Sequence, residues 1–260
     1  MTTVGILGGG QLGAMLAPAL QDLGADVHVY DPDPNAPALR RAARAHNGSW
    51  RDVARLQELF DACDAVTYEF ENVETEGLAR VAGLEKLSPS LDVLRTTQNR
   101  ILEKEFLRAR GLPHAAFVEG RTAGELAAAA RDFGFPAILK TARGGYDGKG
   151  QWKLSSAADV ESLLETPARG ALDASGWVLE EPIDIVLEVS AIVARERNGD
   201  EVVFPLFENE HRDHILDVTL VPARLPDDLE AEAKSVALAA ARALGVTGLL
   251  TTEPFVGRSS

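Results

Sequence analysis

The chain has 260 residues, with 26 Lys and Arg against 40 Asp and Glu, so its formal net charge at pH 7 is −14. This length allows a full hydrophobic core and favours more than one domain. The negative charge disfavours nucleic acid as a partner, because nucleic-acid phosphates bind to basic surfaces. With Cys63 as its single cysteine, the sequence also excludes a disulfide framework.

Targeting signals are not evident in the sequence. No run of eighteen apolar residues occurs, so no membrane span is predicted. The first residues lead directly into a predicted strand and show no signal-peptide pattern. We therefore expect a cytoplasmic protein.

The first predicted elements are a strand, a glycine loop, a helix and a second strand, at Thr3–Leu7, 8–11, Leu12–Leu23 and Asp26–Tyr30. Gly8, Gly10 and Gly13 fit the G-x-G-x-x-G spacing of dinucleotide-binding loops, and Asp31 follows near the expected distance. An NAD(P)-dependent oxidoreductase is therefore one reading. The same strand–turn–helix can bind any phosphate at the N-terminus of its helix, so both readings stay open here.

Two carboxylates follow the next predicted strand, Ala65–Tyr68. Glu69 and Glu71 come just past its end, at the carboxyl edge of the sheet, where open α/β sheets bind ligands. Either carboxylate can accept a hydrogen bond from a ribose hydroxyl or an amine. Solvated loop acids are the alternative.

The middle of the chain is predicted to be mainly helical. One helix is expected from Leu94 to Arg110, and capping boxes are expected at Thr122 with Glu125 and at Ser156 with Asp159. Further helix and strand predictions cover an N-cap at Asp52, a short strand at Leu87, strands Trp177–Glu180, Val189–Ala194, Val202–Phe207 and Val246–Thr252, and a helix from Asp227 to Gly245.

A glycine-rich hairpin is predicted at 136–154. Pro136–Lys140 is a short apolar run that ends in a cation, and Gln151–Leu154 can return as the second strand. Four glycines lie between them, at Gly144, Gly145, Gly148 and Gly150. Three of the chain's six lysines also lie in this segment, at Lys140, Lys149 and Lys153.

Glycine amides can approach a polyphosphate closely because no Cβ intervenes, and lysine supplies a compact charge. The segment is not a Walker A loop, since Lys149 is followed by Gly150 and not by Ser or Thr. An ordinary hairpin tip is the alternative to a phosphate-binding loop.

The sequence K-T-x-x-G-G-Y-D-G-K-G-Q at Lys140–Gln151 resembles the nucleotide-covering loop of N5-carboxyaminoimidazole ribonucleotide synthetases, which are ATP-grasp ligases of purine biosynthesis. Further segments resemble the family at L-G-x-G-Q-L-G (7–13), Y-E-F-E-N (68–72), Q-N-R (98–100), E-N-x-H-x-x-x-I-L (208–216) and V-P-A-R (221–224), the last without an assigned role. The resemblance implies an α/β chain with a Rossmann-like pre-ATP-grasp domain at 1–93, a first ATP-grasp subdomain at 94–180 and an incomplete second subdomain at 181–260.

The resemblance also implies roles for individual residues. The catalytic residues would be Lys140, Tyr146, Asp147 and Lys149. The nucleotide would contact Arg100, Lys140, Gly145, Tyr146, Asp147, Gly148, Lys149, Gly150, Gln151, Glu180, Glu181, Pro182, Ile183, Glu188 and His211. Within that set, Glu180–Ile183 would be the adenine-binding link and Glu188 the acceptor for ribose hydroxyls. The ribonucleotide would contact Gly10, Gln11, Leu12, Glu69 and Glu71, and Glu253 would bind Mg²⁺.

Some of these residues have simpler readings. Glu188 could be only a strand-edge charge, and a lone histidine such as His211 is more often structural. Glu181 and Pro182 depart from the residues of some relatives, and Pro254 replaces the usual residue after the metal-binding glutamate.

The family continues beyond this strand with N-E-[IL]-A-P-R and R-P-H-N-S-G-H segments that have no match here, so the resemblance covers about its first two thirds. In the family, a second Mg²⁺-binding glutamate lies in the N-E-[IL]-A-P-R segment, and Mg²⁺ is anchored by such carboxylates. We therefore expect nucleotide binding with little or no turnover from this 260-residue chain.

The implied reaction is the ATP-dependent carboxylation of 5-aminoimidazole ribonucleotide with bicarbonate, which releases ADP and phosphate. ATP and Mg²⁺ are the expected cofactors, and a homodimer is the expected assembly. The alternatives are another ATP-grasp ligase, such as the formate-dependent glycinamide ribonucleotide transformylase, the NAD(P)-dependent oxidoreductase, and a nucleotide-binding protein without turnover.

Overall fold

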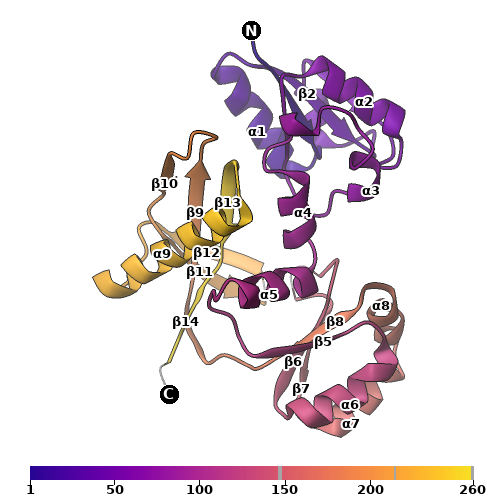
Figure 1. Cartoon of the computed structure of the whole chain (residues 1–260), viewed down its shortest axis with the longest axis vertical. Coiled ribbons are helices and arrows are strands. Elements are labelled where there is room, and N and C mark those ends of the chain that lie inside the picture. The colour runs from indigo at the N-terminus through magenta and orange to yellow at the C-terminus, as the bar shows by residue number, and fades with distance from the viewer. Residues whose placement is uncertain (146–147, 214, 259–260) are drawn as a thin grey trace. The chain divides into compact units, whose positions relative to one another are not determined.

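The computed structural model describes residues 1–145, 148–213 and 215–258, and the chain divides into two compact units (Figure 1). The N-terminal unit contains Met1–Arg95 with Val246–Gly248, and the C-terminal unit contains Thr96–Gly245 with Leu249–Ser260. Among the described residues, no helix is long and apolar enough to cross a membrane.

The N-terminal unit is built on a parallel four-stranded sheet. Its strands are β1 (Thr3–Leu7), β2 (Asp26–Asp31), β3 (Arg44–Asn47) and β4 (Ala65–Tyr68), in the order β3-β2-β1-β4. Its helical segments are α1 (Gln11–Asp22), η1 (Pro37–Arg40), α2 (Val53–Ala62), α3 (Thr75–Leu78), η2 (Leu84–Lys86) and α4 (Leu91–Thr97). The predicted strands β1, β2 and β4 are confirmed, and this order is that of a Rossmann-like half-sheet.

Alternate residues of these strands face opposite helical layers. Ile6 and Val29 pack with Ala17 of α1 on one face, whereas Leu7 and Tyr30 belong to the core cluster on the other face. Helix α2 supplies Leu56, Leu59 and Phe60 to that second cluster. Because both faces are covered, the strands read as apolar runs and not as alternating patterns.

One strand of this unit was missed, and one prediction needs correction. β3 was not predicted, because Arg44–Asn47 is short and mostly polar and is recognisable only by its pairing with β2. Leu87 makes only an isolated bridge to Val66 and does not form the expected strand. The predicted N-cap of α2 is confirmed, since the Asp52 carboxylate accepts from Arg55 N at 3.1 Å.

The C-terminal unit contains an antiparallel sheet of β5 (Phe117–Gly120), β6 (Ala137–Thr141), β7 (Gln151–Leu154) and β8 (Trp177–Glu180), in the order β5-β8-β6-β7. Helices α6 (Ala123–Phe133), α7 (Ala157–Leu164) and α8 (Ala168–Ser175) cover one face (Figure 1). On the other face, Ile101 of α5 (Arg100–Ala109) packs with Phe117, Ala142 and Val178. The predicted β6–β7 hairpin is confirmed, with Lys140 opposite Gln151.

The expected single helix from Leu94 to Arg110 is wrong, because the chain forms α4 and α5 with a break at Gln98 and Asn99. The Asn99 side chain accepts from Ile101 N at 3.0 Å and from Leu102 N at 3.4 Å, so it starts a new helix.

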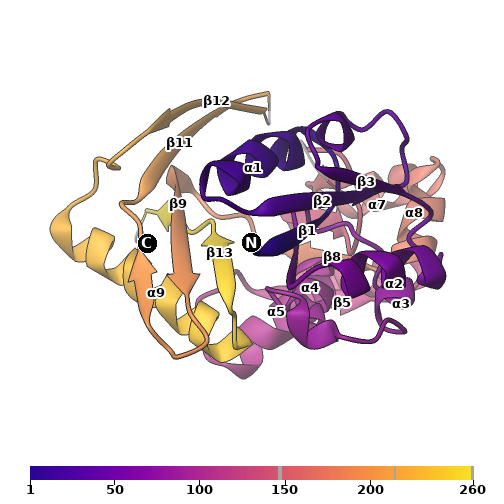
Figure 2. The same cartoon turned by 90° about the horizontal axis from the view of Figure 1, so that it is seen from above.

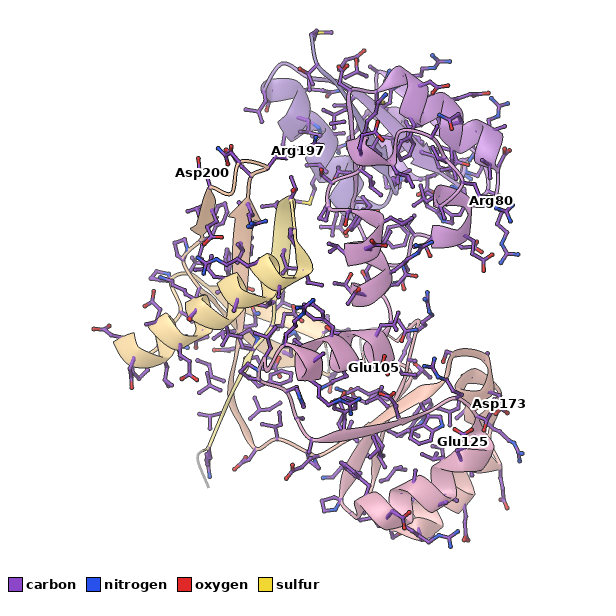
Figure 3. The ribbon with its side chains drawn as sticks, in the orientation of Figure 1. Arg80, Glu105, Glu125, Asp173, Arg197 and Asp200 are labelled. Carbon is purple, nitrogen blue, oxygen red and sulfur yellow. The ribbon has the colours of Figure 1, made fainter. Side chains whose placement is uncertain are left out.

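The two predicted capping boxes have different outcomes. At α7 the box is present, and the Asp159 carboxylate accepts from Ser156 N at 3.0 Å. At α6, Thr122 makes no side-chain cap, although Glu125 accepts from Arg121 N at 2.9 Å. The carboxylate of Asp173 on α8 caps α6 instead, accepting from Ala123 N at 2.7 Å; Figure 3 labels Asp173 and Glu125 near this helix start.

A second sheet in the C-terminal unit contains β9 (Ile185–Arg195), β10 (Glu201–Val203), β11 (Phe207–Arg212), β12 (Ile215–Leu220), β13 (Gly248–Thr252) and β14 (Phe255–Gly257). Its main order is β10-β9-β11-β12, and β13 and β14 also pair with β9. Helix α9 (Asp227–Leu244) lies along β9, as Figure 2 shows. The expected strand Val202–Phe207 is wrong: it is divided around Pro205, which cannot donate to a ladder.

Candidate nucleotide and substrate sites

The glycine loop of the N-terminal unit is held by two carboxylates. Gly9 N donates to Asp31 Oδ2 at 2.6 Å, and Gly10 N donates to Glu69 Oε1 at 3.0 Å. Gly8 has φ +103°, and a Cβ at this position would lie 2.6 Å from Glu69 Cγ. Glycine is therefore required at Gly8 both by its backbone conformation and by the side chain packed over it.

These contacts bear on the dinucleotide reading of the motif. In dinucleotide-binding proteins the amides at the start of the helix bind the pyrophosphate. Here the protein's own Asp31 and Glu69 carboxylates accept from them, so the site favours a hydrogen-bond donor over a phosphate. Burial raises the pKa of Glu69, and its hydrogen bonds from the amides of Gly10 and Gly13 oppose that rise.

The other predicted ribonucleotide contacts in this unit lie at the surface. Gln11 and Leu12 are exposed in the first turn of α1, with Leu12 59% exposed. Glu71 is exposed and accepts from Asn72 Nδ2 at 2.8 Å. The structure thus brings Gly10 and Glu69 together, while the roles of Gln11, Leu12 and Glu71 stay predictions.

A buried carboxylate organises the C-terminal unit's candidate site. Glu180, at the end of β8, is 6% exposed. Its Oε2 lies 2.9 Å from Lys140 Nζ on the neighbouring strand β6, and its Oε1 lies 3.3 Å from Lys104 Nζ on α5. Two ammonium groups therefore share one carboxylate, and the Glu103 side chain on α5 interacts electrostatically with all three groups.

Lys104 was missed by the sequence reasoning, and Glu180 was expected to contact adenine and not two lysines. The available signal was that Lys104 is one of only six lysines and lies four residues after Arg100, one helical turn away. Burial also raises the pKa of the adjacent Glu103, which the charge of Lys104 opposes.

The glycine loop between β6 and β7 is closed at its base by backbone contacts. Thr141 N donates to Gly150 O at 2.9 Å, and Gly148 and Gly150 have φ +73° and +70°. Lys149 is exposed in the loop, and Gln151 begins β7. The predicted catalytic residues Tyr146 and Asp147 lie outside the described residues.

Arg100 does not point freely into this site. Its guanidinium donates to Thr141 O at 2.9 Å and to Gly145 O at 3.0 Å, both at the base of the glycine loop. The expected phosphate contact of Arg100 stays a prediction, and these two bonds give the side chain another role.

The predicted adenine link follows Glu180. Glu181 N donates to Ala116 O at 2.9 Å, which extends the β5–β8 pairing by one residue. Pro182 has no N–H to donate, and Ile183 is 41% exposed. Among the described residues no backbone partner of Ile183 N is found, so this amide and an apolar side chain are available to a flat ligand.

Glu188 and His211 are brought together on β9 and β11. His211 Nδ1 lies 2.7 Å from Glu188 Oε2, and both side chains are 34% exposed. Glu188 lies inside β9 and does not begin the strand as predicted. A half-exposed carboxylate oriented by a histidine is a suitable acceptor for hydroxyl groups.

The V-P-A-R segment has a structural role. The backbone N–H of Arg224 donates to Glu208 Oε2 at 2.9 Å, and the guanidinium of Arg224 also pairs with this carboxylate. Glu208 is 3% exposed. The hydrogen bonds from Arg224 lower the pKa of Glu208 to about 2. This pair attaches the segment that follows β12 to strand β11.

Glu253, the predicted Mg²⁺ ligand, lies exposed between β13 and β14. Over the described ranges, no group of three or more His, Cys, Asp or Glu side chains is placed to hold a metal ion. One carboxylate does not by itself make a Mg²⁺ site, and the metal contact stays a prediction.

Two family models match the chain: a ribonucleotide synthetase preATP-grasp domain at residues 1–98 and an ATP-grasp domain at 105–260. The bifunctional purine synthesis protein purC/E of Dictyostelium discoideum is 37% identical over all of this chain and 26% of its own length. The N5-carboxyaminoimidazole ribonucleotide synthase of Staphylococcus aureus strain COL is 35% identical over 98% of this chain and 66% of its own.

Solved structures agree with these relatives. An ADP complex of N5-carboxyaminoimidazole ribonucleotide synthetase has TM-score 0.88 and 38% identity over 98% of this chain and 67% of its own. The Aspergillus clavatus N5-carboxyaminoimidazole synthase, in complex with ADP and 5-aminoimidazole ribonucleotide, has TM-score 0.85 and 32% identity. The match covers 98% of this chain and 66% of that chain.

The chain thus spans between a quarter and two thirds of the length of these relatives. The preATP-grasp and ATP-grasp models together cover most of its residues, and the fold and the lysine–glycine hairpin agree with them. The chain belongs to the N5-carboxyaminoimidazole ribonucleotide synthetase family of ATP-grasp proteins.

Proposed function

We propose that this chain binds ATP at the β6–β7 hairpin and contributes that site to the carboxylation of 5-aminoimidazole ribonucleotide with bicarbonate. One observation carries the proposal: Glu180 holds the ammonium groups of Lys104 and Lys140 together on one face of the sheet that carries the glycine loop. A buried carboxylate between two lysines keeps two cations in place when no phosphate is present.

The Lys104–Glu180–Lys140 cluster can bind a nucleotide by exchanging the carboxylate partner of its lysines for phosphate. Polyphosphate oxygens can replace the Glu180 carboxylate as partners of one or both lysines. Glu180, on the last residue of β8, would then be released towards a donor such as the adenine amine at the Glu181–Ile183 link. The half-exposed Glu188 is placed to accept from ribose hydroxyls.

The chemistry requires stabilisation of charge on the transferring phosphoryl group. A bicarbonate oxygen attacks the γ-phosphorus while the bond to ADP breaks, giving carboxyphosphate. The exocyclic amine then attacks the carboxyl carbon and phosphate leaves. Lys140 and Lys149 would stabilise the phosphoryl charge, and a closed glycine loop would keep water from the carboxyphosphate.

The ribonucleotide belongs, in this proposal, to the loop of the N-terminal unit. The carboxylates of Asp31 and Glu69 at the Gly8–Gly10 amides make this edge suited to amine and hydroxyl donors and unsuited to a second polyphosphate. The relative in complex with 5-aminoimidazole ribonucleotide supports this choice of substrate. Bicarbonate, Mg²⁺, a homodimer and a cytoplasmic location enter the proposal from the family alone.

Calorimetric titration of the 260-residue chain with ADP and with NADH tests the proposal. ADP should bind and NADH should not, because Lys140 and Lys104 place cations beside the β6–β7 hairpin while carboxylates occupy the G-x-G-x-x-G amides. Adding 5-aminoimidazole ribonucleotide in a separate titration should give an ADP-independent binding signal. NADH binding in the absence of ADP binding would overturn the assignment.

A further inference from the structure

The carboxylate of Glu180 lies on the sheet face that α5 covers. Its neighbours in register are Phe117 of β5 on one side and Ile138 of β6 on the other, and both are apolar. Because Glu180 is only 6% exposed, its charge depends on partners from the protein more than on water. Its two oxygens meet different lysines, Oε2 at Lys140 Nζ and Oε1 at Lys104 Nζ. Each lysine therefore has its own oxygen of one buried carboxylate.

The two lysines have different surroundings. Lys140 is the second-last residue of β6, just before the glycine loop, and its side chain is 23% exposed. Lys104 lies on α5, its side chain is 14% exposed, and its Nζ lies 5.9 Å from the centre of the Phe117 ring. An ammonium that contacts both a ring face and a carboxylate is attracted by two groups. Lys140 can therefore turn to a ligand at the loop, whereas Lys104 is held on the helix side of the sheet.

The contacts of the two lysines with Glu180 also differ in kind. Lys140 Nζ donates a hydrogen bond to Oε2 at 2.9 Å, whereas Lys104 Nζ forms an ion pair with Oε1 at 3.3 Å. Oε1 is buried and, among the residues that the structure describes, accepts no hydrogen bond. A buried acceptor without a donor costs free energy, so a closer approach of Lys104 to Oε1 is favourable. Lys104 can thus bind Glu180 more tightly when Lys140 leaves it.

We infer that Lys104 is a positioning residue that keeps Glu180 in place when Lys140 exchanges this carboxylate for phosphate, so that the freed Oε2 faces the base of the nucleotide. The inference rests on the proposed nucleotide site and separates the roles of its two lysines, since Lys140 contacts phosphate and Lys104 does not. A carboxylate only accepts hydrogen bonds, so a Glu180 held in this way favours a base with an amino group over one with a carbonyl at the same position. Lys104 then contributes to the preference for adenine without touching the ligand.

Calorimetric titration with three ligands tests this role. The ligands are ADP, inosine 5′-diphosphate, whose base has a carbonyl in place of the amine, and inorganic tripolyphosphate, which has no base. Lys104→Met should weaken ADP binding by about tenfold and reduce the preference for ADP over inosine diphosphate by the same factor, because Glu180 is no longer held. Tripolyphosphate binding should stay the same in this variant. Lys140→Met should instead weaken tripolyphosphate binding by about tenfold, because a phosphate contact is lost.

Arg108→Met is the matched control, because Arg108 lies one turn further along α5 and its guanidinium lies 4.8 Å from the centre of the same Phe117 ring. It should leave the preference for ADP unchanged. Lys104→Gln provides the same test if Lys104→Met folds poorly. An unchanged preference for ADP in the Lys104 variants would overturn the inference, and so would an equal loss of affinity for all three ligands, which indicates a purely structural role.

A double-mutant cycle without ligand decides whether Lys104 holds Glu180 even if the unmodified chain binds no ADP, a result that would overturn the proposed function. Lys104→Met and Glu180→Gln should each raise the equilibrium constant for unfolding in urea. Because the two side chains act on each other, the double variant should raise this constant about tenfold less than the product of the two single effects. Effects that simply multiply would show that Lys104 does not hold Glu180 and would overturn the inference.

Discussion

The chain contains two glycine loops that look alike in sequence but differ in the side chains that form hydrogen bonds with their backbone. The loop after β1 has its Gly9 and Gly10 amides bonded to the carboxylates of Asp31 and Glu69. The loop after β6 follows the cation Lys140 and has its carbonyls bonded to the guanidinium of Arg100. One loop is therefore lined by anions and the other is held by cations.

This difference shows that glycine spacing alone does not identify a ligand. Glycine permits positive φ and close approach in both loops, as at Gly8 and Gly150. The ligand class is decided by the charge that the rest of the unit places on the loop. The G-x-G-x-x-G match was a correct prediction of a strand–turn–helix and a poor guide to a dinucleotide.

The largest effect is expected from Glu180→Gln, which breaks the cation cluster of the second loop. Removing the carboxylate deprives Lys104 and Lys140 of the group that pairs with both, so the free energy of unfolding should fall by about 2 kcal/mol, a value reduced for their partial exposure. Urea denaturation measures this change. Glu181→Gln, at the exposed neighbour, is the control, and equal stabilities for the two variants would refute the counter-ion role of Glu180.

Lys140→Ala and Lys153→Ala compare two lysines of the same hairpin. Lys140 lies beside Glu180, whereas Lys153 is exposed on β7 opposite Ile138. Loss of a charge-assisted phosphate contact should weaken ADP binding by roughly 1.5–3 kcal/mol for Lys140→Ala and by much less for Lys153→Ala. Calorimetry measures both affinities. Equal small losses would mean that the second loop is an ordinary hairpin tip.

A smaller, pH-dependent effect is expected from Glu69→Gln in the first loop. Because burial raises the pKa of Glu69 in the folded state, the folded chain binds this proton more tightly than the unfolded chain does. Stability contributed by Glu69 is then full below its ordinary pKa and is lost as pH rises through the folded value. Glu69→Gln should lack this loss in thermal denaturation at several pH values.

The exposed carboxylate of Glu71 supplies the comparison for that experiment. Glu71→Gln should alter the pH dependence far less than Glu69→Gln does, because the charge of Glu71 makes only the smallest contribution to the raised pKa of Glu69 and its carboxylate accepts from the neighbouring Asn72. A Glu69→Gln profile that coincides with those of Glu71→Gln and the unmodified chain would show that Glu69 is not a buried acid on the loop.

Much of the fold could be predicted from the sequence because its signals are local. Apolar runs predicted β1, β2, β4, β6 and β8, and Asp52 and Asp159 predicted helix starts from residues within one turn. The wrong or missing predictions of helices and strands occurred where a local signal was overlooked or weak. Asn99 and Pro205 are breaks that the sequence contains, whereas β3 is defined only by its neighbour β2.

The sequence by itself determined the family, because the K-T-x-x-G-G-Y-D-G-K-G-Q loop and its companion segments are long and specific. It also determined that lysines and glycines meet at one hairpin, since they are adjacent in the chain. These features depend on residues a few positions apart, whose geometry is set by backbone periodicity.

Only the tertiary structure decided which charged group meets which loop. Glu69 reaches Gly10 across 59 residues, Glu180 reaches Lys140 across 40, and Arg100 reaches Gly145 across 45. Strand order and helix packing create these contacts, and no periodicity in the sequence encodes them. The sequence therefore predicts both glycine loops, whereas the fold places carboxylates at one loop and cations at the other.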